Sequence, residues 1–217
     1  MKSSDPSMRV WCAAFTMAEV LVVIAVIAFT ALLVLPAMVE TKSKRAKFNC
    51  SKNLAQIDLA FLTWAGDNKD HYPMSACTNA AGKKIYADAT NAFRYFQAVS
   101  NEISNPSVLI CPEDRKRRAA TNFTSDFNGS HISYFIGLDA ADIYPQSFLA
   151  GDSHLTIGRP LTNGIMVLTS GSPVRWTAER HDGSGNIAMA DGSVQQFSTQ
   201  ALRHAAGACT NRLLMPR

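Results

Sequence analysis

The strongest pattern in the chain is a continuous apolar run from Phe15 to Val39. Glu19 is the only ionisable side chain among these 25 residues. A helix of this length, at about 1.5 Å per residue, covers about 37 Å, which exceeds the ~30 Å hydrocarbon thickness of a bilayer. The pattern therefore predicts a transmembrane helix over 15–39.

Apolar side chains continue at helical spacing after this run. The stripe consists of Cys50, Leu54, Ile57, Phe61 and Trp64. Such a stripe is typical of a helix that packs one face against a globular domain. Gly66 and the polar residues after it indicate the end of the helix. We expect one helix over 15–65, with Pro36 as the place for a bend.

The remaining residues, 66–217, predict one globular domain with short helices and strands. A polar loop covers 70–90, and apolar spacing predicts helices over 91–103 and 199–206. Short runs of β-forming residues predict strands over 108–110, 131–138, 146–150 and 165–169. This mixture indicates an α+β fold.

The clearest local signal in the domain is a hairpin around Asp191 and Gly192. An Asp-Gly pair favours a two-residue turn, because both central positions need positive φ. Apolar and polar residues flank the pair from Asn186 to Phe197. A two-residue turn would place Met189 opposite Val194.

Glu19 raises an electrostatic problem for the membrane helix. A carboxylate inside a spanning helix costs about 2.5 kcal/mol or more unless a cation pairs with it. The apolar run offers no cation. Cleavage between Ala14 and Phe15 would create an α-ammonium four residues from Glu19, one helical turn away. That amine could serve its own chain or a neighbouring subunit.

The N-terminal residues resemble the class III signal of type IV pilins and type II secretion pseudopilins. The shared pattern is a short basic leader, a small residue, Phe-Thr-x-x-Glu and an apolar helix. The resemblance implies that a prepilin peptidase cuts after Ala14 and N-methylates Phe15. It also makes Glu19 the assembly carboxylate and Pro36 the kink-forming proline. The chain departs from the family at Ala14, where glycine is usual, and at Ala18, where a large aliphatic residue is usual.

Short signatures later in the chain are similar to verrucomicrobial and planctomycetal pseudopilin-like proteins. They are Asn53–Ile57 (Asn-Leu-x-Gln-Ile), Cys111–Asp114 (Cys-Pro-x-Asp), His181–Gly185, the Ala-Asp-Gly-Ser turn and Asn211–Pro216. The resemblance implies a leader over 1–14 and a pilin-like fold. In that fold one half of the helix is transmembrane and the other half packs on an antiparallel sheet domain.

Two other interpretations of the N-terminus remain open. An ordinary secretory signal peptide could end at Leu35-Pro36-Ala37, although its apolar core is usually only 7–15 residues long and this one contains a carboxylate. An uncleaved membrane anchor is the second. Cys12 does not indicate lipid attachment, because the residues before it are not small and aliphatic.

The basic residues near the helix and the family resemblance imply opposite orientations. Four of them follow the run and two precede it: Lys42, Lys44, Arg45 and Lys47, against Lys2 and Arg9. Counting them places the amino terminus outside. The resemblance implies the reverse, because the peptidase meets the leader on the cytoplasmic side. We follow the resemblance and expect an inner-membrane protein with its C-terminal domain in the periplasm.

Four cysteines follow the leader: Cys50, Cys77, Cys111 and Cys209. None forms a C-x-x-C pair, so no zinc site is expected from their spacing. Disulfides are the expectation for a domain outside the cytoplasm. The four cysteines allow three pairings, and the sequence does not choose among them. We favour Cys50 with Cys111, and Cys77 with Cys209.

No constellation in the sequence predicts catalysis or a firm cofactor site. His181, Asp182 and Ser184 are adjacent in a glycine-rich loop and lack a third group to orient a base. Asp182, Asn186 and Asp191 are weak candidates for calcium ligands, but their spacing is not that of an EF-hand, and turn formation explains them equally well. We expect a protein that is not an enzyme and has no cofactor.

The basic run from Arg115 to Arg118 could contact phosphate, but such runs are commonly solvated loops. The formal net charge of +4 does not demand a polyanionic partner, so we expect no nucleic acid.

The function expected from the resemblance is structural. The chain would be a pseudopilin or pilin-like subunit in a type II secretion or type IV pilus-like fibre. Its partners would be the prepilin peptidase, other pilin-like subunits and an inner-membrane assembly platform. The alternative is a membrane-anchored extracytoplasmic module that binds glycan or DNA and does not polymerise. The choice between secretion and pilus machinery stays open.

Overall fold

The computed structural model describes residues 16–76, 86–208 and 211–217, and leaves the side chains of 34–43 and 208 undescribed. The chain divides into two compact units, one ending at Lys42 and one from Ser43 to Arg217. Helix α1 (Met17–Asp67) contributes residues to both. The fold is α+β, as the sequence predicts.

The described part of the first unit is Thr16 and the N-terminal part of α1. Every side chain from Thr16 to Leu33 is exposed, including Phe29 at 67% and Leu32 at 75%. Among the residues described, no helix has the length and apolarity of a membrane span. The predicted span, 15–39, includes Phe15, which is not described. It also includes 34–39, whose side chains, that of Pro36 among them, are not described.

The second unit is built around a six-stranded antiparallel sheet in the order β4-β8-β1-β2-β6-β7. Its strands are β1 (Tyr134–Gly137), β2 (Phe148–Asp152), β4 (Ile165–Leu168), β6 (Ser184–Met189), β7 (Val194–Ser198) and β8 (Asn211–Leu214). A two-stranded sheet pairs β3 (Leu155–Thr156) with β5 (Arg175–Trp176). The helices are α2 (Pro73–Ala76), α3 (Phe93–Ala98) and α4 (Thr199–Ala208), and the 3-10 turns are η1 (Pro106–Leu109), η2 (Gly129–His131) and η3 (His181–Gly183).

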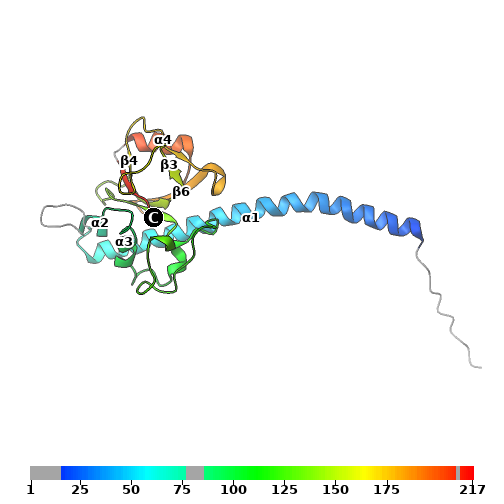
Figure 1. Cartoon of the computed structure of the whole chain (residues 1–217), viewed down its shortest axis with the longest axis horizontal. Helices are drawn as coiled ribbons and strands as arrows, with labels where there is room; N and C mark the ends of the chain where they lie inside the picture. Colours follow the sequence, from blue (N-terminus) through cyan, green and yellow to red (C-terminus); the bar gives the residue numbers. More distant parts are fainter. Residues whose placement is uncertain (1–15, 77–85, 209–210) are drawn as a thin grey trace, which may run out of the picture. The chain divides into compact units, whose positions relative to one another are not determined.

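Successive side chains of the sheet belong alternately to two separate hydrophobic clusters. Tyr134 and Ile136 of β1 belong to the first cluster, and Phe135 between them belongs to the second. The period of two follows from strand geometry, because successive side chains point to opposite faces. The first cluster also contains residues of α1, α2 and α3, and the second contains residues of α4, β3 and β5. Figure 1 shows α4 and β3 on one side of this unit and α2 and α3 on the other.

The predicted helical stripe is buried in the first cluster. Cys50, Leu54, Ile57 and Phe61 are 0% exposed, and Trp64 is half-buried. Helix α1 ends at Asp67, two residues after the predicted end at 65, and Lys69 and Asp70 then adopt positive φ.

The strand and helix predictions in the domain have mixed outcomes. Strands lie within or overlap the predicted segments 131–138, 146–150 and 165–169, and α4 matches 199–206. The helix predicted over 91–103 forms only in part: α3 covers Phe93–Ala98. The strand predicted over 108–110 is wrong. Pro106 starts the 3-10 turn η1, and the Asn105 side chain accepts a hydrogen bond from the Ser107 amide at 2.9 Å. This side-chain cap stabilises the turn conformation over a strand.

The hairpin forms, but not with the predicted two-residue turn. Ala188 pairs with Val194, and the Met189 amide donates to the Ser193 carbonyl at 2.8 Å. Gly192 has φ of 87°, whereas Asp191 is not among the described residues with positive φ. Only one position is left-handed, so the loop is longer and the register shifts by one residue.

Asp58 of α1 is a buried carboxyl group in the first cluster region. Its side chain is 2% exposed, and its Oδ1 has no hydrogen-bond partner among the described residues. Burial, together with the negative charge of Asp191, raises the pKa of Asp58 to about 7. Tyr72 is its other titratable neighbour, and the Tyr72 hydroxyl donates to the Ala190 carbonyl at 3.1 Å.

We predict that Asp58→Asn removes a pH dependence of stability. The pKa of Asp58 is about 3.8 when unfolded and about 7 when folded, so between these values the folded state binds more protons. The free energy of unfolding therefore falls as the pH rises from about 4 to about 7. At pH 8 the variant should be more stable than the wild type by up to about 4 kcal/mol. Urea unfolding at pH 5 and pH 8 measures this. The exposed Asp67→Asn variant should keep the wild-type slope, and a wild-type curve without slope would contradict the assignment.

Candidate functional site

Four side chains from distant parts of the sequence meet in the interior of the second unit. Cys50, Cys111, Asp152 and His181 each offer one metal-ligating atom, and these atoms all lie within 4.8 Å of one another. Cys50 comes from α1, Cys111 from the loop after η1, Asp152 from the end of β2 and His181 from the start of η3. All four are buried. We call this group the Cys-Asp-His cluster.

Asp152 is the centre of the hydrogen bonds in the cluster. Its Oδ2 accepts from the backbone amide of Asn186 at 2.8 Å and from the Asn186 side chain at 3.2 Å. Its Oδ1 accepts from the Cys50 thiol at 3.1 Å, and the same sulfur lies 3.3 Å from the Tyr134 hydroxyl. The carboxylate therefore joins α1 to two neighbouring strands of the sheet.

His181 is held in an unusual backbone conformation. His181, Asp182 and Gly183 have consecutive positive φ values of 54°, 52° and 72°. Left-handed backbone is uncommon for bulky residues and persists only where surrounding contacts fix it. The His181 amide donates to Glu113 Oε2 at 2.6 Å, and Ser184 Oγ donates to the His181 carbonyl at 2.6 Å.

The His181 ring faces the cluster with one nitrogen and Glu113 with the other. Nε2 lies 3.2 Å from Cys111 Sγ and 3.6 Å from Asp152 Oδ2. Nδ1 lies 3.0 Å from Glu113 Oε2, but without the alignment of a hydrogen bond. The nitrogen that faces the sulfur and the carboxylate is thus available as a ligand or a proton carrier.

Opposite charges within the cluster shift the pKa values of His181 and Cys111 so that each favours the charged form of the other. Burial disfavours the charged ring of His181, but Asp152 and Cys111 outweigh it and raise the pKa of His181 to about 10. The hydrogen bond from Cys50, aided by His181, lowers the pKa of Cys111 to about 6 against the effect of burial. Burial raises the pKa of Cys50 well above its usual range. The arrangement favours a Cys111 thiolate beside a His181 imidazolium.

A buried ion pair lies directly next to His181 in the sequence. Arg180 Nη1 is 3.2 Å from Asp114 Oδ2, and both side chains are 7% exposed. Arg180 also donates to the Ser133 carbonyl at 3.2 Å and to Ser153 Oγ at 3.0 Å. The pKa of Asp114 is held below its usual range: burial opposes this, but a hydrogen bond from Ser133 and the charge of Arg180 outweigh it. This pair ties the strand ends to the loop that carries Cys111.

The predicted disulfide between Cys50 and Cys111 is not formed in the structure. The two sulfur atoms belong to the same cluster, but both residues are free thiols. Cys77 and Cys209 lie outside the described residues, and so do the predicted cleavage residues Ala14 and Phe15.

The predicted calcium candidates are not brought together. Asp182 pairs with Lys47 at 3.1 Å, and Asn186 is buried against Asp152. Asp191 is in the hairpin turn, where its Oδ1 accepts from the Ser193 amide at 2.9 Å. Asn186 lies inside β6 and Asp191 lies in the turn after its last residue, Met189, so the strand separates them by about 10 Å or more at ~3.3 Å per strand residue.

Two residues of the basic run make contacts within the domain. Lys116 Nζ lies 2.7 Å from Glu179 Oε1. Arg117 donates to the carbonyls of Ile132 and Pro216, the latter at 3.0 Å. Arg115 and Arg118 are exposed.

Glu19, the predicted assembly residue, forms a reciprocal cap with Thr16 at the start of α1. Glu19 Oε2 accepts from the Thr16 amide at 2.7 Å and from the Thr16 hydroxyl at 2.8 Å. The Glu19 amide donates to Thr16 Oγ1 at 3.3 Å. This pattern is a capping box, which satisfies amides that a helix start otherwise leaves unpaired.

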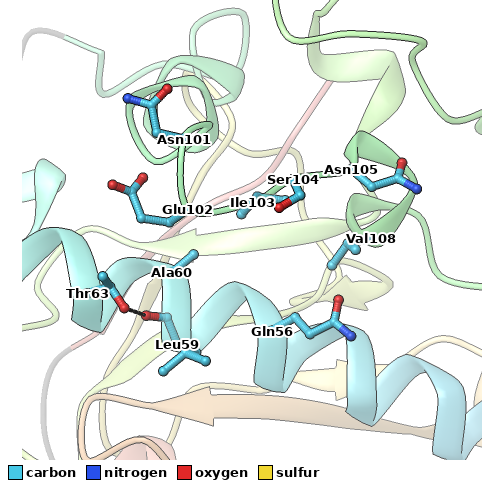
Figure 2. A pocket seen from close by; sticks show the side chains of 10 residues that line it. All are labelled: Gln56, Leu59, Ala60, Thr63, Asn101, Glu102, Ile103, Ser104, Asn105 and Val108. Atoms are coloured by element: carbon cyan, nitrogen blue, oxygen red, sulfur yellow. Dashed lines mark hydrogen bonds between the residues drawn. The ribbon is translucent and has the colours of Figure 1, made fainter.

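A surface hollow of about 540 Å³ lies between α1 and the segment 101–108 (Figure 2), and no residue of the cluster lines it. Its lining residues are Gln56, Leu59, Ala60, Thr63, Asn101, Glu102, Ile103, Ser104, Asn105 and Val108. Glu102 is the only ionisable residue among them. Neutral amides and one carboxylate provide a contact surface but no acid and base pair.

Sequence reasoning missed the Cys-Asp-His cluster because its members share no local spacing. The sequence predicts Cys111 only as a signature residue and the disulfide partner of Cys50, and it groups His181 only with its own loop. Asp152 is not singled out. Their meeting depends on the pairing of β2 with β6 and on the position of α1, which no short motif encodes.

We predict that Asp114→Asn destabilises the domain by about 3–5 kcal/mol, because it leaves the buried Arg180 charge without its partner. The midpoint of guanidinium unfolding at pH 7 measures the loss. The exposed Asp126→Asn variant, in the same loop region, should change stability by less than about 0.5 kcal/mol. Equal midpoints for the two variants would show that the ion pair does not hold this loop.

Comparisons with protein-family models, with curated proteins and with solved structures found no match for the chain.

Proposed function

We propose that this chain is a structural pilin-like subunit, processed by a prepilin peptidase and assembled into a type II secretion or type IV pilus-like fibre. The observation that carries the proposal is the surface of the first unit. From Thr16 to Leu33 every side chain is exposed, and Glu19 is the only ionisable one.

Such a surface needs a cover that the described chain does not supply. Soluble monomers rarely expose contiguous apolar patches larger than a few hundred Å². Lipid covers a surface of this kind before assembly, and equivalent helices of neighbouring subunits cover it in a fibre. The helix is therefore the element that anchors the subunit in the inner membrane and later packs in the fibre core.

The second part of α1 has the role of a scaffold in this proposal. Its buried stripe, Cys50 to Ala65, belongs to the same hydrophobic cluster as sheet residues such as Ile136 and Leu149. A helix that is apolar all round in one part and striped in the next fits the pilin-like plan of a transmembrane half and a docked half. The sheet domain would then lie in the periplasm.

Glu19 has two roles that must be separated. In the described chain it caps its own helix through Thr16. In a fibre it would also neutralise the Phe15 ammonium of a neighbouring subunit, which removes the cost of a lone carboxylate in an apolar environment. The first role needs a hydrogen-bond acceptor, and the second needs a negative charge.

We assign the chain no catalytic reaction. The chemistry is performed on it, by the peptidase, and its partners are that enzyme, other pilin-like subunits and the assembly platform. The internal contacts of Lys116 and Arg117 do not favour the alternative of an anchored module that binds DNA or glycan through the basic run.

The first prediction concerns processing. Mass spectrometry of the chain from a host with an active prepilin peptidase should find an N-methylated Phe15 as the first residue. Ala14→Gly should be processed at least as fast, and a bulky Ala14→Leu should remain uncut because the small residue at the cleavage site is lost. An intact leader on the wild-type chain in that host would refute the proposal.

The second prediction separates capping from charge. Glu19→Ala loses both, whereas Glu19→Gln keeps an acceptor for the capping box and loses the charge. If charge pairing contributes about 1.4 kcal/mol per subunit, both variants should enter fibres about tenfold less than the wild type. Quantitative immunoblotting of sheared fibres, corrected for membrane-inserted subunit, measures this. Normal incorporation of the glutamine variant would reduce Glu19 to a helix cap.

A further inference from the structure

We propose that Cys50, Cys111, Asp152 and His181 bind one zinc ion in a closed structural site. The set offers two sulfur atoms, one imidazole nitrogen and one carboxylate oxygen, all within 4.8 Å of one another. Sulfur and imidazole ligands select a transition metal of the zinc type over calcium or magnesium, which prefer oxygen. The inference does not rest on membrane insertion or on fibre assembly.

The distances between the donor atoms match a tetrahedral zinc site. Zinc bonds of about 2.0–2.3 Å give a tetrahedron with edges of about 3.3–3.8 Å. Cys50 Sγ lies 3.1 Å from Asp152 Oδ1, and Cys111 Sγ lies 3.2 Å from His181 Nε2. His181 Nε2 lies 3.6 Å from Asp152 Oδ2, the second oxygen of the same carboxylate, so the ring also lies close to the ligand group that Oδ1 would supply. Small outward shifts would bring the two shorter edges to the length that the metal requires.

The groups behind the ligands orient them as a metal site needs. Zinc-binding histidines commonly present their second nitrogen to a carboxylate. His181 Nδ1 lies 3.0 Å from Glu113 Oε2. Asn186 holds Asp152 Oδ2 with two donors, which leaves Oδ1 for the metal once the Cys50 proton is gone. The left-handed backbone at His181 and Asp182 is what turns this ring inward.

Burial argues for a structural role. Cys50, Cys111 and Asp152 are 0% exposed and His181 is 1% exposed, so four protein ligands would close the coordination shell without an open position for substrate. Binding displaces two protons to solvent, the Cys50 thiol proton and the proton that Cys111 and His181 share, and leaves two thiolates, one carboxylate and a neutral ring around the ion. The ion would fasten α1 to the end of β2 and to the loops that carry Cys111 and His181.

A disulfide is the competing use of the same cysteines. It would join only Cys50 and Cys111 and would use neither the His181 nitrogen nor the Asp152 oxygen that faces the two sulfur atoms. Both thiols are free in the structure. The convergence of a nitrogen and an oxygen on the two sulfur atoms favours the metal.

The test is metal content of the purified full chain, in detergent and after removal of loosely bound ions. Inductively coupled plasma mass spectrometry should find about one zinc per chain. Replacement by Co²⁺ should give the thiolate charge-transfer absorption and the intense visible bands of a tetrahedral site. Cys111→Ser and His181→Gln should lose the bound zinc. Cys77→Ser and the exposed His204→Gln, matched in residue type, should keep it.

A second measurement uses the wild-type chain, so it does not depend on whether the ligand variants fold. Chelation of the wild-type chain should lower Tm by about 5 °C or more, and Zn²⁺, but not Ca²⁺ or Mg²⁺, should restore it. Three results would each overturn the proposal: a wild-type chain without stoichiometric metal and without a Tm response, a Cys111→Ser variant that keeps its zinc, or a Cys50–Cys111 disulfide in the purified protein. An uncleaved chain that binds zinc would refute the fibre proposal and leave this one intact.

Discussion

The packing of the second unit depends on the hydrogen bonds and the counter-charge that one buried carboxylate, Asp152, requires. Asp152 is 0% exposed, and an isolated ionised carboxylate at such a depth would be strongly unfavourable. Its pKa is nevertheless held low, because the partners around it outweigh burial, and His181 contributes most among them. Because the side chains and amides that contact Asp152 come from α1, β6 and η3, the position of one charge constrains the position of three elements. A core assembled from apolar contacts alone would tolerate small slips of α1 along the sheet. Hydrogen bonds to a fixed oxygen do not.

The local parts of this design could be predicted from the sequence, and the long-range parts could not. The stripe on α1 was predictable because period and burial are properties of one helix, and Cys50, Leu54, Ile57 and Phe61 are all in the core. The strand predicted over 108–110 failed because Asn105 and Pro106 start a turn that outweighs the β preference of Val108 and Ile110. The hairpin register shifted because Asp191 does not take the left-handed conformation that a two-residue turn needs.

The Cys-Asp-His cluster shows the same limit more sharply. Cys50 was predicted only as part of the stripe and as half of a disulfide, and Asp152 carried no signal at all. What joins them is the antiparallel pairing of β2 with β1 and β6, which sets Asp152 beside Tyr134 and Asn186. Spacing rules find metal ligands that lie on one loop or one helix. They do not find donor atoms that a sheet assembles from four separate segments, and the absence of a C-x-x-C pair says nothing about such a cluster.

The two units meet different physical requirements. In the second unit, apolar side chains fill both faces of the sheet, and the buried charges are paired at Arg180, Asp114, Asp152 and His181. Asp58 is the main departure, and protonation resolves it. In the first unit, the apolar side chains have no cover within the described chain, so the free energy of burying them is still available for binding. In the proposed function, stability is concentrated in the second unit and association in the first. A pilin-like subunit that moves from a bilayer into a polymer would need this division, because its anchoring helix would change partners while the other unit stays folded.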